Sequence, residues 1–158
     1  MVISIKLIKE DDLINLTDLI LPLNHFNNFI FELQNLEGLN KKFENEANIN
    51  RINESTIYRF SPLAGVIKQR SSYIEVIKIK KESPTFLELL LNVSPYVTET
   101  ISLLVDNKGE IIEDKIYESL NKDDKFKNYD EHKKRLIIKY ILLFFRFLLR
   151  YLTITINR

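Results

Sequence analysis

Alternation of apolar and polar residues near both ends of the chain predicts short β-strands there. The two segments are Val2–Lys9 and Leu152–Ile156. β-Branched and aromatic residues dominate three further segments, which we interpret as two or three strands of one antiparallel sheet: Thr56–Phe60, Ala64–Gln69 and Ser72–Lys80. The pattern therefore predicts a small antiparallel sheet.

Helical spacing of apolar residues follows the first predicted strand. Asp11 or Asp12 is suited to cap a short helical turn, which Pro22 is expected to end. Apolar residues then recur over Leu23–Leu36 at the spacing of an amphipathic helix, with polar residues on its other side. This helix is expected to end near Gly38, because glycine is the common residue just after a helix C-terminus.

Two Ser-Pro pairs suggest where later helices begin. Serine can accept a hydrogen bond from a free N–H at a helix start, and proline suits the first helical position. Ser83-Pro84 thus predicts a helix whose apolar face is Phe86–Leu91, and Ser94-Pro95 either begins a second helix or kinks the first. A turn at Asn107–Gly109 and a short helix at Ile111–Leu120 are expected to follow.

The last part of the chain predicts a long helix that is both basic and apolar. It should begin at Asp130 and Glu131, because acidic residues suit a helix N-terminus. Of the 17 residues in Leu136–Leu152, 14 are apolar. The cationic residues of this segment fall within one narrow stripe at about 100° per residue: Arg135, Lys139, Arg146 and Arg150.

Charge divides the chain into two parts. The 158 residues include 23 Lys and Arg against 22 Asp and Glu, for a net charge of +1. All the acidic residues lie at or before Glu131, whereas Lys133–Arg158 holds seven basic residues and no acidic one. We therefore expect an acidic α+β body at 1–129 and a cationic, hydrophobic C-terminal helix at 130–158, packed together as one domain. The predicted fold class is α+β, with a small antiparallel sheet packed on helices.

Composition excludes several classes of chemistry. The chain has no Cys, which rules out disulfides, thiol nucleophiles and cysteine-ligated metal clusters. With only three Gly, it has little from which to build a glycine-rich phosphate loop. A net charge near zero argues against a broad basic surface for nucleic acid.

Part of the chain resembles a group of small bacterial α+β proteins of unassigned role. Their recurring element is a β-strand that leads into a Ser-Pro pair and an apolar helix. The matching segments cover about half of the chain: Ile3–Leu7, Leu16–Leu33, Ile74–Ile79 and Ser83–Leu91. Glu82 stands where many of these proteins carry Gly. The resemblance implies an α+β fold and a place in gene content associated with bacterial conflict and defence.

Candidate catalytic and metal-binding residues have simpler interpretations. Asp130, Glu131 and His132 are adjacent, but consecutive helical side chains point about 100° apart, so a solvated helix start is expected instead of a metal site. His25 lies in an apolar segment without the context of an activated nucleophile, which favours a structural role. We therefore expect no catalytic residue, no metal and no cofactor, and the chain is not predicted to be an enzyme.

The C-terminal helix is the predicted site of function. Its apolar arc is too wide for a helix packed on one side only, so it is a core helix, is buried in a partner or a second copy, or contacts a membrane. The hypothesis is a non-catalytic interaction or oligomerisation module, in a bacterial defence system, that binds a protein partner or itself. Electrostatic contacts are assigned to Arg135, Lys139, Arg146 and Arg150. Apolar contacts are assigned to Phe144, Phe145, Phe147 and Leu148.

Two alternatives use other partners. A membrane-associated effector would employ the same helix, whose cations can reach anionic lipid headgroups. A nucleic-acid-binding accessory protein would pair basic clusters with nearby tyrosines. The expected location is the cytoplasm, or the membrane periphery if the helix contacts lipid.

Overall fold

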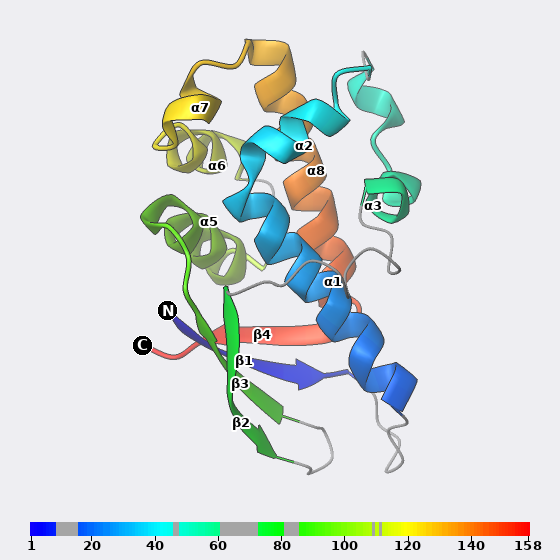
Figure 1. Ribbon diagram of the computed structural model, residues 1–158, viewed down its shortest axis with the longest axis vertical. Helices are drawn as coiled ribbons and strands as arrows, with labels where there is room; N and C mark the ends of the chain where they lie inside the picture. The colour runs from blue at the N-terminus through cyan, green and yellow to red at the C-terminus, as the bar shows by residue number, and fades with distance from the viewer. Residues whose placement is uncertain (9–15, 46–47, 61–72, 81–85, 109, 111) are drawn as a thin grey trace.

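A four-stranded antiparallel sheet lies beside a layer of helices, which confirms the predicted α+β class (Figure 1). The computed structural model describes residues 1–8, 16–45, 48–60, 73–80, 86–108, 110 and 112–158. The strands are β1 (Val2–Leu7), β2 (Ile74–Lys80), β3 (Phe86–Leu91) and β4 (Leu152–Ile156), in the order β2-β3-β1-β4. The strands predicted near both ends of the chain and within Ser72–Lys80 are therefore confirmed.

One face of the sheet forms a wall of the core. Ile3 of β1 lies opposite Leu89 of β3 and Ile156 of β4, and Ile5 lies opposite Leu87 and Ile154. Because side chains alternate between the two faces of a strand, these residues share one face. Those on β1 and β3 are almost completely buried, so the helices cover the inner strands on this side.

The helices vary widely in length. Their bounds are α1 (Leu16–Gln34), α2 (Leu36–Lys42), the 3₁₀ helix η1 (Ile49–Arg51), α3 (Glu54–Phe60), α5 (Pro95–Asp106), α6 (Glu113–Leu120), α7 (Asp124–Lys127) and α8 (Glu131–Leu149). The helices predicted at Ser94-Pro95, at Ile111–Leu120 and at Asp130 are confirmed. Ser94-Pro95 begins a separate helix and does not kink an earlier one, because the chain before it ends a strand at Leu91. The predicted turn is present at Asn107 and Lys108, where Lys108 has a φ of 52°; Gly109 lies outside the described residues.

Two predicted helix ends are wrong. Pro22 lies inside α1, where it is buried, so packing offsets the one backbone hydrogen bond that proline cannot donate. Gly38 lies inside α2, and the break comes earlier, at Asn35. The Asn35 side chain accepts a hydrogen bond from the Gly38 N–H at 3.2 Å, which starts a new helix.

Two segments have the opposite secondary structure to that predicted. Phe86–Leu91 is strand β3 and not a helix, because it pairs with β1 on one side and β2 on the other. These two ladders outweigh the helix propensity of its leucines. Thr56–Phe60 is helical and forms most of α3. There the Asn53 side chain accepts from the Ser55 N–H at 3.0 Å, and Thr56 Oγ1 accepts from the Asn53 N–H at 3.1 Å. Ala64–Gln69 and Ser83-Pro84 lie outside the described residues.

Helix α8 occupies the centre of the helical layer. It contacts α1, α3 and α6 and also reaches α2, η1 and β4 (Figure 1). The Phe29 ring of α1 lies 5.3 Å from the ring of Phe144 and 5.9 Å from that of Phe145. Of the three interpretations of the wide apolar arc, the structure therefore supports the first, in which α8 is a core helix.

Replacement of Phe145 by Ala should lower the free energy of unfolding by about 3–5 kcal/mol, because it removes a buried ring from the centre of the core. The matched control is Arg135→Ala, which truncates an exposed side chain of the same helix. It should change stability by no more than about 0.5 kcal/mol. Urea denaturation followed by circular dichroism measures both variants. Equal stability of the two would contradict the central position of α8.

Candidate functional site

The cationic stripe of α8 lies between α6 and the segment that contains η1 and α3. Within it, Lys139 Nζ donates to the Ile49 carbonyl at 2.6 Å, and Arg150 forms an ion pair with Glu54 at 2.5 Å. Arg135 and Arg146 are exposed, and Arg146 also interacts with another group of the chain. At least three of the four predicted electrostatic residues therefore interact with other groups of this chain.

Other lysines hold the same segment. Lys133 donates to the carbonyl of Phe43, just after α2. Lys42 donates to the Phe60 carbonyl at 2.6 Å and lies 3.3 Å from Glu32 Oε1. Four basic side chains thus fix the described parts of 42–60 against α8 and against each other.

The four predicted apolar contact residues are buried in the core. Phe144, Phe145, Phe147 and Leu148 each expose 3% or less of their surface. A contact surface needs exposed side chains, and these already contact α1 and other parts of the chain. In this fold they serve the core, and a partner cannot reach them.

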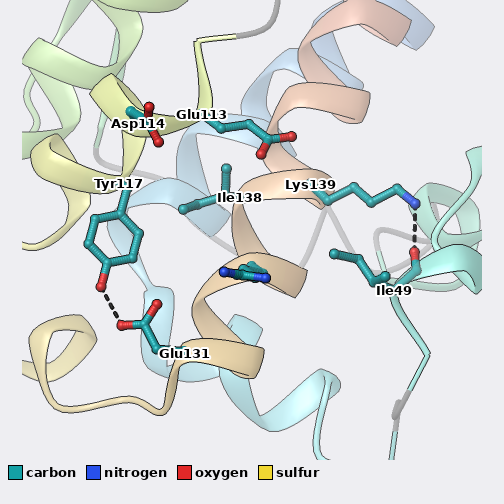
Figure 2. A pocket seen from close by; sticks show the side chains of 8 residues that line it. Ile49, Glu113, Asp114, Tyr117, Glu131, Ile138 and Lys139 are labelled. Atoms are coloured by element: carbon teal, nitrogen blue, oxygen red, sulfur yellow. Dashed lines mark hydrogen bonds between the residues drawn. The ribbon is translucent and has the colours of Figure 1, made fainter.

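A hollow of about 540 Å³ lies between α6, α8 and η1 (Figure 2). Figure 2 shows Tyr117 and Glu131 pointing toward one another, and the Tyr117 hydroxyl donates to Glu131 Oε1 at 2.5 Å. In the same view Lys139 points toward η1, where it binds Ile49.

The charges around this hollow are mixed. Two cations, Arg135 and Lys139, line it together with the carboxylates of Glu113, Asp114 and Glu131. No group of three His, Asp or Glu in the described part of the chain is placed to hold a metal ion. The lining contains no Ser, Cys or His that could act as a nucleophile or as an imidazole base.

A second, smaller hollow of about 220 Å³ lies beside the other end of the stripe. Its lining residues come from α3, from α8 and from the residue just after α8: Glu54, Ile57, Leu143, Arg146, Phe147 and Arg150. The Arg150 guanidinium lies 5.3 Å from the centre of the Phe147 ring, a cation–π distance. The stripe thus borders two shallow hollows instead of forming one continuous basic surface.

His25 is a buried member of an aromatic cluster. Its ring meets the rings of Phe147 and Tyr58 edge-on, at centroid distances of 5.0 Å and 5.9 Å. It exposes 3% of its surface, and among the described residues no hydrogen-bond partner meets its Nδ1. Burial lowers the pKa of His25 below its usual 6.5, because the charged imidazolium loses solvation. These contacts give His25 a packing role.

The outer edge of β2 is the most exposed apolar feature of the sheet. Val76, Ile77 and Ile79 expose 56%, 52% and 53% of their surfaces. At the opposite edge of the sheet, Leu152 and Ile154 of β4 expose only 0% and 6%. The helices therefore cover β4 and leave β2 uncovered.

Backbone groups add to the exposure of β2. β2 is an edge strand of the described sheet, so among the described strands only β3 pairs with it. A free edge presents N–H and C=O groups that can pair with another strand. We call the outer side of Ile74–Lys80 the β2 edge; the exposed side chains of Val76, Ile77 and Ile79 project from the faces of the sheet next to it.

The sequence pattern predicts β2 as a strand, but it does not predict that the side chains of this strand are exposed. The segment IEVIKIK has apolar side chains at both parities, which is a signal of a strand with two apolar sides. Whether such a strand lies inside the sheet or at its edge depends on pairing with distant β3, which the local pattern does not encode.

No protein-family model matches the chain, and neither a curated protein nor a solved structure matches it. Within the described residues, no helix combines the length and the hydropathy that a membrane crossing requires.

Replacement of His25 by Leu should flatten the dependence of stability on pH. The folded-state pKa of His25 lies below its unfolded value, so the unfolded chain takes up the proton first as pH falls. The wild-type protein should therefore lose stability as pH falls below about 6.5 and through the lower folded pKa. The variant should lack that component, measured by urea denaturation at a series of pH values. An identical slope in both proteins would contradict the neutral, buried state of His25.

Proposed function

We propose that this protein is a non-catalytic assembly module whose copies associate through the β2 edge. The observation that carries the proposal is the half-exposure of Val76, Ile77 and Ile79 on a strand that, among the described strands, pairs with β3 alone. Strand addition at such an edge supplies main-chain hydrogen bonds and buries apolar side chains at the same time.

The position of the β2 edge favours this role. Figure 1 shows β2 and β3 extending away from the helical layer, so a second strand can approach β2 from the side. The nearest exposed charges are of both signs: Glu75, Lys78 and Lys80. A strand of mixed charge suits a partner that also has mixed charge, which a second copy provides.

The contact surface therefore differs from the one expected on the C-terminal helix. The aromatic residues of α8 are buried, and Lys139 and Arg150 hold the chain's own segments. Membrane contact through α8 would require those aromatic side chains to leave the core, where Phe144 and Phe145 already pack against α1. Assembly through β2 requires no such rearrangement.

Replacement of Ile77 by Lys should abolish self-association, because it places a charge at the centre of the free edge. Sedimentation velocity over a range of protein concentration measures the effect. The matched control is Ile8→Lys, because Ile8 is a similarly exposed isoleucine, at 54%, that lies outside β2. The control should associate like the wild type, and both variants should remain folded by circular dichroism.

Two results would contradict the proposed function. One is a wild-type protein that stays monomeric up to near-millimolar concentration. The other is association that Ile77→Lys leaves unchanged, which would place the contact elsewhere on the surface.

A further inference from the structure

We infer that two copies join as a symmetric dimer, with their β2 strands antiparallel about a two-fold axis between Val76 and Ile77. This inference rests on the proposed function and specifies its partner, register and stoichiometry. The resulting sheet would run without interruption from one copy into the other. Its basis is a pattern of side chains along β2 that is complementary to itself.

A β-bulge in β2 sets this pattern. Pairing with β3 skips Ile77: Val76 lies opposite Leu89, and Lys78 lies opposite the next residue, Glu88. A bulge adds one residue to a strand, so it shifts the alternation of the side chains that follow. The bulge thus determines which side chains of β2 share a face.

The register with β3 shows the two faces. Glu75 and Lys78 lie opposite Leu90 and Glu88, which are two residues apart and so share the face of the sheet away from the core. Ile74 and Ile79 lie opposite Leu91 and Leu87, which are buried on the core face. Without the bulge, residues 75 and 78 would lie on opposite faces.

The order of apolar and charged positions from Ile74 to Ile79 is therefore the same in both directions, with the acidic and the basic residue exchanged. Their order is apolar, acidic, apolar, apolar, basic, apolar. In an antiparallel pair centred between Val76 and Ile77, Ile74 lies opposite Ile79 of the second copy, with both on the core face. Val76 lies opposite Ile77, so apolar side chains meet apolar side chains along the centre of the contact.

The charges complete the match. Glu75 lies opposite Lys78 of the second copy, both on the other face of the sheet, and symmetry produces this pair twice. Opposite charges directly across an antiparallel pair stabilise it, whereas like charges destabilise it. Within each copy Glu75 also accepts a hydrogen bond from Asn92 at 3.0 Å, which orients the carboxylate on this face.

The two-fold contact limits the assembly to two copies. A two-fold contact uses the same surface on both partners, so it leaves no second β2 edge for further growth. The remaining edge strand of each copy is β4, whose core-facing side chains Leu152 and Ile154 are already buried. A dimer, and not a filament, is the expected product.

Charge reversal tests the register. Glu75→Lys alone places Lys opposite Lys78, and Lys78→Glu alone places Glu opposite Glu75. Each single variant should dimerise on the order of tenfold more weakly than the wild type, because two attractive pairs become repulsive. The double variant, which carries both changes, restores opposite charges and should recover wild-type dimerisation.

A mixture of the two single variants provides the sharper test. A dimer of one Glu75→Lys chain and one Lys78→Glu chain has two attractive pairs, so native mass spectrometry should show the mixed dimer in excess over either homodimer. The mixed dimer also shows that both variants are folded. Thermal unfolding monitored by circular dichroism provides an independent check of each variant alone.

The outcomes separate this inference from the proposed function. If Ile77→Lys abolishes association but the charge reversals have no effect and no mixed dimer accumulates, the register is wrong and the β2 edge stands as the contact. Growth beyond two copies overturns the two-fold arrangement in the same way. If the wild type does not associate, or if Ile77→Lys has no effect, the proposed function itself fails.

Discussion

The burial of the aromatic residues of α8 joins parts of the chain that are far apart in the sequence. Phe144 and Phe145 contact α1, and α3 and α6 pack beside the same helix. Each such ring contributes about 1.5–3 kcal/mol through its removal from water. Because α8 ends just before β4, the same helix also delivers the last strand to the sheet. A segment whose composition suggested a contact with something outside the molecule is thus the element around which the molecule packs.

The cations of α8 act on backbone carbonyls as well as on carboxylates. Lys133 and Lys139 donate to the carbonyls of Phe43 and Ile49, which lie at or near the ends of short helical segments. Phe43 is the C-cap residue of α2, where a carbonyl has no partner within the helix, so the Lys133 ammonium group satisfies it. Ile49 is the first residue of η1, and its carbonyl accepts from Lys139 in addition to the Ile52 N–H. The Lys and Arg side chains cover apolar surface with their stems while their charged ends reach these groups. The cations that are concentrated in this part of the sequence therefore form contacts within the chain.

Local sequence determined the elements whose signals lie within a few residues. Asp130, which caps α8, and Pro95, which begins α5, identified both helix starts. Signals failed where distant pairing decided the structure: the leucines of Phe86–Leu91 favour a helix, yet two neighbouring strands make the segment β3. The candidate site followed the same rule. Arg135, Lys139 and Arg146 lie on α8 and Arg150 follows its last residue, but the partners of Lys139 and Arg150 in η1 and α3 and the exposure of Val76 depend on contacts across the fold.

The pairing of β1 with β4 has a consequence for the synthesis of the chain. Ser4 and Asn157 are joined by a side-chain hydrogen bond of 2.9 Å, although 153 positions separate them in the sequence. At a translation rate of roughly 5–20 residues per second, β1 leaves the ribosome about 8–30 s before β4 exists. During that interval Ile3 and Ile5 have no partner strand until β3 is made, and after that they have β3 alone. The nascent chain therefore carries β1 without one of its two partner strands until Leu152–Ile156 has been made, and this side of the sheet is completed only then.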